Sequence, residues 1–473
     1  MPNPVVLVAN RGPVGFRRTP DGRLTTVRGA GGLVTALRPL VDLGDLTWVA
    51  SAIGEAEREL AAEGARDERS AAGTPFRLRL VAHDPEAYRL FYGVVANPVL
   101  WFVQHGLWDL KHDPDADLTT PWNEGYVACN RALASAAVEE LDRAPGAWLF
   151  AQDYHAYLVP SLVRAARPDA RIAHFVHIPW VGPDAWSVLP PEIARAIHEG
   201  LLASDSIGFH TERWRDAFVA SCDALLGRGA DAERRSHVNP LAVDTAEFDA
   251  LAGSEAVRTR RSELVADRLE ILVLRVDRTD PAKNAVRGFQ AFGRLLERRP
   301  ELRGRIALLA NLDPSRQEIP EYADYRRATE AAAAAVNERY GHPGWKPVRL
   351  EIRDDFPASI AGYIEYDVLL VNPVMDGLNL VAKEAPLVNE RDGALVLSRQ
   401  AGAHAELADW VIGVDPLDVD GQAEALARAI DMPRAERRSR LDAIRTRVRA
   451  HDLDAWVAQE LAELASRAPA RVG

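Results

Sequence analysis

Short apolar runs alternate with amphipathic stretches along most of this chain. Continuous runs of this length, rich in Val, Ile and Leu, are typical of strands buried on both faces, as in a parallel sheet. The runs lie at 5–9, 148–151, 172–176, 271–276, 306–310, 368–371 and 394–397. Between two of them, Val286, Phe289, Phe292 and Leu296 recur every three or four residues and predict a helix over 284–298. Alternating strands and helices predict an α/β protein with doubly wound parallel sheets.

The chain is too long for one such sheet. Its 473 residues suggest two or three domains at about 150 residues each. We expect a boundary at 239–248, because a charged helical segment follows it and leads into a fresh strand at Ile271. The sequence thus divides into domains 1–245 and 246–452, with an amphipathic terminal helix and polar tail at 453–473.

Composition and charge narrow the classes of function. Apolar residues make up 47% and charged residues 27%, as in an ordinary globular protein. A formal net charge of -12 repels phosphate backbones, so we expect neither a nucleic-acid nor an anionic-membrane partner. No apolar run approaches the ~20 residues of a membrane span, and no basic region precedes the first apolar run as in a signal peptide. We expect a cytoplasmic enzyme. The sequence does not decide whether the enzyme forms a homo-oligomer.

Polar, chargeable residues follow the predicted strands repeatedly. Ligands of open α/β sheets bind at the carboxyl ends of the strands. Residues of this kind stand at 10–11, 153–155, 177–179, 278–283, 311–316 and 376–377. Strand-end loops are polar in any case, so the set as a whole, and no single member, indicates a site.

The segment 278–283 is the most informative of these. Asp280 suits an N-cap and Pro281 the first helical position, which would place Lys283 in the first turn. The helix dipole disfavours a cation there. Lys283 and Arg278 together therefore favour a bound anion such as a diphosphate. The alternative is a solvated surface lysine with an unrelated arginine.

Two further segments could contact a ligand. The segment 376–384 leads from a strand through a Gly turn into a helix. Its carboxylates, Asp376 and Glu384, and the backbone N–H groups at the helix start could together hold a sugar hydroxyl, a phosphate and a ribose. A turn aspartate and a solvent-facing glutamate are the alternative. The Gly-rich segment 28–33 resembles a phosphate loop, but ~20 residues separate it from the first strand, unlike a nicotinamide fingerprint. A plain turn explains it equally well.

The histidines and aromatics allow two interpretations each. His155 and His177 could act as acid–base groups, although a strand-end histidine is often structural. Tyr92 and Trp101 could line a sugar site or simply pack in the core.

An acidic stretch imitates part of a calcium loop. Its carboxylates are Asp113, Asp115, Asp117 and Glu124. Leu118 stands where that loop requires glycine, so we expect a solvated acidic turn and no metal site.

Seven motifs follow one another along the chain. They are Asn-Arg-Gly-Pro-Val at 10–14, Gly-Gly-Leu-Val-Thr at 31–35, Asn-Pro-Val-Leu-Trp at 97–101, Asp-Tyr-His at 153–155, His-Ile-Pro at 177–179, and the segments 278–283 and 376–384. As an ordered set, they resemble the trehalose-6-phosphate synthase family of retaining glycosyltransferases. The resemblance covers nearly the whole chain. It implies the GT-B fold, in which two Rossmann-like domains face each other across a cleft and a C-terminal helix crosses back to the first domain.

The resemblance also implies a role for each matching residue. The acceptor, glucose 6-phosphate, would be bound by Arg11, Tyr92, Trp101, Asp153 and Arg316, with the two arginines on its phosphate. The donor, a nucleoside-diphosphate glucose, would be bound by Gly32, His177, Arg278, Lys283, Asp376, Asn379, Leu380, Val381 and Glu384. The residues expected to take part in catalysis are Arg278, Lys283, Asp153, His177 and Asp376.

The implied chemistry needs no cofactor. Breaking the bond to a nucleoside diphosphate leaves negative charge on the departing phosphate, which Arg278, Lys283 and a helix N-terminus would stabilise. No metal is then required. The resemblance implies retention by a front-face mechanism, in which the leaving phosphate takes the acceptor's proton.

Several residues depart from the usual family pattern, namely Gly12, Gln152, Thr279, Pro281, Asn284 and Leu378. The segments 278–284 and 384–392 are similar to the validoxylamine-phosphate synthase branch, which couples pseudo-sugars. This chain keeps the Asn-Arg and Gly-Gly-Leu motifs that the branch tends to lose, which favours the trehalose reaction. A pseudo-glycosyltransferase and a non-catalytic sugar-phosphate sensor are the alternatives. The family uses both UDP-glucose and GDP-glucose, and the donor base stays open.

Overall fold

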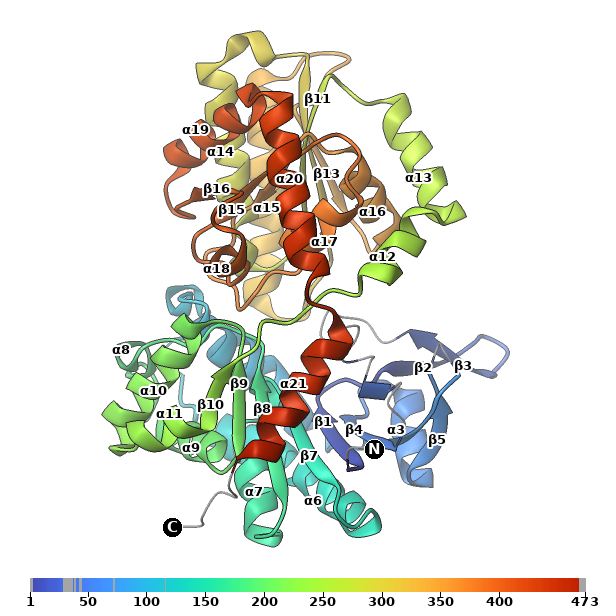
Figure 1. The fold of residues 1–473 in the computed structure, drawn as a ribbon, viewed down its shortest axis with the longest axis vertical. Helices are drawn as coiled ribbons and strands as arrows, with labels where there is room; N and C mark the ends of the chain where they lie inside the picture. Colours follow the sequence, from blue (N-terminus) through green and yellow to red (C-terminus); the bar gives the residue numbers. More distant parts are fainter. Residues whose placement is uncertain are drawn as a thin grey trace. The chain divides into compact units, whose positions relative to one another are not determined.

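The computed structural model describes residues 3–28, 37, 40–41, 45–70, 73–114 and 116–467 (Figure 1). Its contacts divide the chain into two compact units. The first unit comprises Met1–Leu241 with Leu453–Gly473, and the second comprises Ala242–Asp452. Each unit has its own largely parallel sheet, so the predicted α/β class is confirmed.

The first unit is built on an eight-stranded sheet in the order β10-β9-β8-β7-β1-β4-β6-β5. β5 runs antiparallel to β6, and the other neighbours pair in parallel. The strands are β1 (Val5–Ala9), β4 (Leu46–Ser51), β5 (Arg66–Arg69), β6 (Pro75–Val81), β7 (Trp148–Gln152), β8 (Arg171–Val176), β9 (Ser206–Phe209) and β10 (Ser236–Val238). A separate hairpin pairs β2 (Val14–Arg18) with β3 (Leu24–Arg28). The strand order reverses between β1 and β7, and ligands bind at such a point.

Helices flank this sheet, and one of them is unusual. Phe91–Trp101 forms a π-helix, η1, which continues directly from α4 (Pro85–Leu90). Such segments are rare in proteins, and those that occur often lie at functional sites. The other helices in the described part of this unit are α3 (Glu55–Glu63), α5 (Phe102–Gln104), η2 (Trp108–Leu110), η3 (Pro121–Val127), α6 (Ala128–Arg143), η4 (Tyr154–Ala156), α7 (Val159–Ala166), α8 (Pro183–Trp186), α9 (Pro191–Leu202), α10 (Glu212–Leu226), α11 (Gly229–Arg235) and α21 (Leu453–Ser466).

The second unit has a six-stranded parallel sheet in the order β13-β12-β11-β14-β15-β16. The strands are β11 (Ile271–Arg278), β12 (Ile306–Asp313), β13 (Val348–Ile352), β14 (Val368–Val371), β15 (Ala394–Ser398) and β16 (Ile412–Val414). The order reverses between β11 and β14. The helices are α12 (Thr245–Ala252), α13 (Glu255–Ala266), η5 (Pro281–Lys283), α14 (Ala285–Arg298), η6 (Pro300–Leu302), α15 (Pro320–Tyr340), α16 (Phe356–Glu365), α17 (Val381–Val388), α18 (Ala403–Leu407), α19 (Val419–Asp431) and α20 (Arg434–Arg449).

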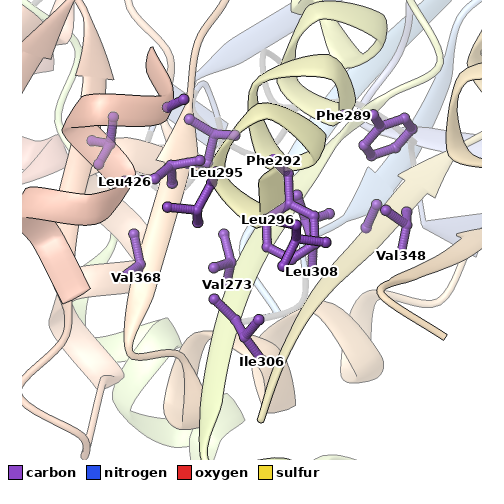
Figure 2. Close-up of a cluster of buried hydrophobic side chains, with 14 of the residues drawn as sticks. Val273, Phe289, Phe292, Leu295, Leu296, Ile306, Leu308, Val348, Val368 and Leu426 are labelled. Carbon is purple, nitrogen blue, oxygen red and sulfur yellow. The ribbon is translucent and has the colours of Figure 1, made fainter. Parts of the chain in front are cut away.

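The apolar stripe of α14 forms part of a buried core in this unit. Phe289, Phe292 and Leu296 are fully buried and pack among side chains of β11 and β12, including Val273 and Leu308 (Figure 2). α15 and α19 contribute to the same cluster. The helix predicted over 284–298 is therefore confirmed, and its packing fixes the start of α14 beside the end of β11.

The C-terminal helix α21 packs on the sheet of the first unit, beside β8 and β9 (Figure 1). The Trp456 indole Nε1 donates to the carbonyl oxygen of Asn239 at 3.1 Å. The buried Glu460 carboxylate accepts from His237 Nε2 at 2.9 Å and from Asn239 Nδ2 at 2.7 Å. Side-chain contacts therefore tie the end of the chain to β10 and the residue after it.

Candidate active site

The turn after β11 presents Lys283 in the second unit. The Asp280 carboxylate accepts from the backbone N–H of Ala282 at 3.0 Å and caps the short 3₁₀ turn η5. Asn284 follows with a left-handed φ of 62°, and α14 begins only after it. The sequence predicted Lys283 in the first turn of the helix. It lies before the α-helix instead, because the left-handed Asn284 separates the two helical segments.

Lys283 meets Asp376 where the strand order of the sheet reverses. The Lys283 ammonium pairs with Asp376 Oδ2, and the exposed fractions of the two side chains are 14% and 13%. Asn379, with a φ of 78°, donates from Nδ2 to the same carboxylate oxygen at 3.0 Å. The Asn379 Oδ1 accepts from the backbone N–H of Ala382 at 3.3 Å, which joins the turn to α17. Three predicted donor residues thus share one hydrogen-bonded cluster.

Two arginines share the buried Asp280 carboxylate. Arg278 Nη2 lies 3.5 Å from Asp280 Oδ2, and Arg316 Nη1 lies 3.4 Å from the same oxygen. Arg278 is 41% exposed, whereas Arg316 is 8% exposed and also donates to the Tyr322 hydroxyl at 2.6 Å. The sequence predicted Asp280 only as a cap and gave no signal for Tyr322. Asp280 therefore links a residue expected on the donor to one expected on the acceptor phosphate.

A buried polar network supports the Lys283 turn. Arg275 in β11 is fully buried and pairs with Asp277 at 2.9 Å. Its guanidinium also donates to the backbone carbonyl of Lys283 and to Asn372 Oδ1. A Cβ on Gly288 would lie 2.6 Å from Arg275 Nη1, so a larger residue at this position would displace the guanidinium. The sequence analysis did not predict this network, because Arg275 lies within the run 271–276, whose apolar pattern indicates only a buried strand.

Glu384 occupies a different environment in α17. Burial raises the pKa of its carboxyl to about 7, and the nearby Glu247 adds to the effect. The Tyr363 hydroxyl donates to Glu384 Oε2 at 3.4 Å. Of the other predicted donor residues, Leu380 and Val381 stand at the start of α17. The protein thus holds a carboxyl group that is partly protonated near neutral pH.

In the first unit, Asp153 and His177 meet at the ends of β7 and β8. Asp153 is buried and has a φ of 63°. Its Oδ1 accepts from the backbone N–H of His177 at 3.1 Å. The His177 ring lies beside the fully buried Gln152, with 2.9 Å between His177 Nε2 and Gln152 Oε1. These strands lie next to the point where the strand order reverses.

Aromatic rings surround His177. Phe175 lies 4.6 Å and His210 5.3 Å away between ring centroids, and Trp456 of α21 lies 6.4 Å away. Burial, with His210 and His174 nearby, holds the pKa of His177 well below its ordinary value. The ring is therefore neutral at physiological pH.

The remaining predicted acceptor residues of this unit lie just after β1 or in the π-helix η1. Arg11 follows β1, and its carbonyl oxygen accepts from Trp48 Nε1 at 3.0 Å. Tyr92 in η1 stacks on His155 with 5.9 Å between centroids. Trp101, the last residue of η1, is buried and stacks on His105 at 4.0 Å. The π-helix therefore presents both predicted aromatics, one half-buried and one in the core.

Some predicted residues lie outside the described part of the chain. Gly32, with most of the Gly-rich loop at 28–33, and Asp115 belong there. Among the described residues no group of three or more His, Cys, Asp or Glu side chains is arranged to hold a metal ion. None of the described helices combines the length and apolar character of a membrane span.

Known proteins similar to this chain agree with the resemblance. The model of glycosyltransferase family 20 matches residues 3–466. The trehalose-6-phosphate synthase of Mycolicibacterium smegmatis is 32% identical over 98% of this chain and 92% of its own length. The validamine 7-phosphate valienyltransferase of Streptomyces hygroscopicus subsp. jinggangensis is also 32% identical, over 90% of this chain and 87% of its own length.

Solved structures match the fold over nearly the whole chain. The E. coli trehalose-6-phosphate structure bound with UDP-2-fluoro glucose has a TM-score of 0.83 at 26% identity and covers 99% of this chain and 100% of its own. The UDP-forming synthase of Burkholderia xenovorans in complex with glucose-6-phosphate has a TM-score of 0.81 at 27% identity, with coverages of 98% and 100%. The chain therefore belongs to glycosyltransferase family 20 and is a GT-B glycosyltransferase of the trehalose-phosphate synthase type.

Proposed function

We propose that this enzyme transfers glucose, with retention, from UDP-glucose or GDP-glucose to glucose 6-phosphate and so forms trehalose 6-phosphate. The observation that carries the proposal is the cluster of Lys283, Asp376 and Asn379 where the strand order of the second unit reverses, with Arg278 at the end of the same strand β11. The solved relatives that bind UDP-2-fluoro glucose and glucose-6-phosphate support this choice of substrates.

The charges of the second unit suit the departing diphosphate. In the absence of substrate, Asp376 balances the Lys283 ammonium. We expect a bound diphosphate to attract both Lys283 and Arg278, which releases the Asp376 carboxylate to accept from a glucose hydroxyl. Preorganised cations of this kind stabilise the negative charge that develops as the sugar–phosphate bond breaks. Glu384 would then hold the ribose, with Leu380 and Val381 beside it.

The first unit supplies groups suited to the acceptor. A sugar hydroxyl can donate to the Asp153 carboxylate, and Tyr92 offers an aromatic face. Arg11 is the group of this unit that would bind the phosphate of glucose 6-phosphate. His177 would contact the glucose of the donor. The leaving phosphate would take the acceptor's proton, so the reaction needs no general base from the protein.

No metal or other cofactor takes part in this proposal, because Lys283 and Arg278 supply the charge stabilisation. Activity should persist in EDTA. Loss of activity in EDTA that added Mg²⁺ or Mn²⁺ restores would contradict this part of the proposal.

The proposal is tested by incubating the purified protein with glucose 6-phosphate and either UDP-glucose or GDP-glucose. We expect trehalose 6-phosphate, identified by NMR of its two α-anomeric centres, and the ratio of the two rates identifies the base. Lys283→Ala should form product on the order of 10²-fold more slowly. Donor binding without product from either donor would contradict the proposal.

A second candidate is transfer of a pseudo-sugar. It is favoured by the equal identity to the valienyltransferase and by the segment 278–284. A parallel reaction with validamine 7-phosphate as the acceptor and a nucleotide-linked valienol as the donor tests it. Turnover there and none with glucose 6-phosphate would replace the first proposal with the second.

A further inference from the structure

Gln152 is a buried polar residue to which the proposed chemistry assigns no role. It is the last residue of β7 and its side chain is fully buried. Its Oε1 lies 2.9 Å from His177 Nε2, whereas its Nε2 is buried with no hydrogen-bond partner among the described residues. Because burying an unpartnered amide donor costs free energy, we ask what this placement accomplishes.

The contact determines where the His177 ring carries its proton. An amide oxygen only accepts hydrogen bonds, so the ring must donate from Nε2. A neutral imidazole has one donor and one acceptor nitrogen, and this leaves Nδ1 as the acceptor. The neighbouring His210 follows the same pattern, because the backbone N–H of Leu241 donates to its Nδ1 at 3.3 Å. Gln152 itself does not titrate, so it offers the same acceptor at every pH.

The rest of the surroundings keep the ring in place. The His177 backbone N–H is held by the Asp153 carboxylate at 3.1 Å. Phe175 and Trp456 pack near the ring. With the backbone and the ring plane restrained in this way, the remaining freedom is the choice between the two tautomers, and Gln152 acts on that choice.

We propose that Gln152 is a positioning residue that holds His177 as the Nε2–H tautomer, so that Nδ1 accepts a hydrogen bond from a hydroxyl of the donor sugar. The second half of this inference rests on the proposed function; the first half does not. An acceptor nitrogen suits a sugar hydroxyl, which donates readily, whereas the opposite tautomer would present a second donor to it.

The test is a long-range ¹H–¹⁵N correlation spectrum of the full chain labelled with ¹⁵N-histidine, which distinguishes a protonated ring nitrogen from a bare one. His177→Asn identifies the His177 signals among the 12 histidines. We expect Nε2 protonated and Nδ1 bare in the wild type. Gln152→Met removes the acceptor at nearly constant shape and should shift the tautomer ratio by about fivefold, the worth of one net hydrogen bond.

Two further variants complete the comparison. Gln104→Met removes a buried amide of the same unit that bonds to Tyr157 and Pro179, and should leave the His177 tautomer unchanged. Gln152→Asn withdraws the amide by one methylene and should act like Gln152→Met, which covers the case in which the Met variant does not fold. We expect kcat of the two Gln152 variants to fall on the order of 10-fold.

The outcomes separate this inference from the proposed function. An Nδ1–H tautomer in the wild type, or an unchanged ratio in both Gln152 variants, overturns it even if trehalose 6-phosphate is formed. The spectrum needs no turnover, so a failure of the enzyme assay does not affect the tautomer result. A bare Nδ1 resonance that stays in place when the productive donor binds would overturn the contact with the sugar.

Discussion

The charged residues expected to contact the donor are held in position by partners of opposite charge before any substrate arrives. Lys283 pairs with Asp376, and Arg278 lies beside Asp280. A buried ion pair gains little net free energy, because desolvation offsets most of its attraction. The pair instead fixes the position of the Lys283 ammonium at the end of β11. We expect the diphosphate of the donor to replace Asp376 as its anionic partner.

Removal of the Lys283 ammonium should therefore affect turnover more than folding. We expect Lys283→Ala to lower kcat by about 10²-fold, because the developing charge of the diphosphate loses a preorganised cation. Steady-state kinetics measure this effect. The exposed Lys346 provides the control, and Lys346→Ala should leave kcat unchanged. A near-normal kcat for Lys283→Ala would exclude Lys283 from stabilising the leaving group.

Glu384 should make the stability of the ligand-free protein depend on pH. Its pKa is about 7 in the folded chain and near 4.5 in the unfolded chain, so the folded state holds the proton longer as pH rises. The free energy of unfolding should then fall between pH 4.5 and 7. Glu384→Gln lacks this pH-dependent loss, so its free energy of unfolding should gain on that of the wild type by about 3 kcal/mol between pH 4.5 and pH values above 7.

Urea unfolding at several pH values measures the difference between the two proteins. The exposed Glu318 provides a matched control, and Glu318→Gln should leave the slope with pH as in the wild type. If the curves of Glu384→Gln and the wild type run parallel from pH 4.5 to 8, the Glu384 carboxyl is not buried as described.

Individual strands and helices place these residues by where they end. β7 ends at Gln152 and β11 at Arg278, so the residues that follow lie at the carboxyl edge of each sheet. The buried central strands are continuous apolar runs and were predicted from the sequence. The edge strand β13 was not predicted, because the charged residues Arg349 and Glu351 interrupt its apolar run. The sequence also predicted that Lys283 lies in the first turn of a helix. The left-handed Asn284 instead separates the 3₁₀ turn η5 from α14.

The helix α21 should contribute strongly to the stability of the first unit. Trp456 is buried against Phe150 and Phe175 and donates to Asn239. We expect Trp456→Ala to lower the free energy of unfolding by about 3–5 kcal/mol, as large-to-small changes in cores do. Chemical denaturation checks this, and the exposed Gln459→Ala on the same helix should have little effect. A loss below 1 kcal/mol for Trp456→Ala would show that the helix is not docked there.

The whole molecule combines one contiguous unit with one that needs both ends of the chain. Ala242–Asp452 contains a complete sheet with its core, whereas the first unit includes Leu453–Gly473. His237 and Asn239 bond to Glu460 across more than two hundred residues of sequence. The two units should therefore differ when each is produced alone.

We expect residues 242–452 to fold cooperatively by themselves and to bind UDP or GDP, because most of the proposed donor contacts lie in this unit. Residues 1–241 should unfold at a lower denaturant concentration than the same unit within the full chain. A peptide of residues 453–473 should restore part of the difference by replacing α21. A fragment 242–452 that is unfolded by circular dichroism would contradict the independence of this unit.

The sequence by itself determined the class of the fold, the central strands and the order of the motifs, because buried parallel strands and amphipathic helices need local apolar patterns that can be read along the chain. It also placed Lys283, Asp376 and Asp153 correctly after their strands. Only the tertiary structure decided which of these residues meet. Asp280 lies between Arg278 and Arg316, Arg275 supports the Lys283 turn, and Gln152 faces His177. Such contacts join residues from different strands, and their geometry depends on strand order and register, which no local pattern records.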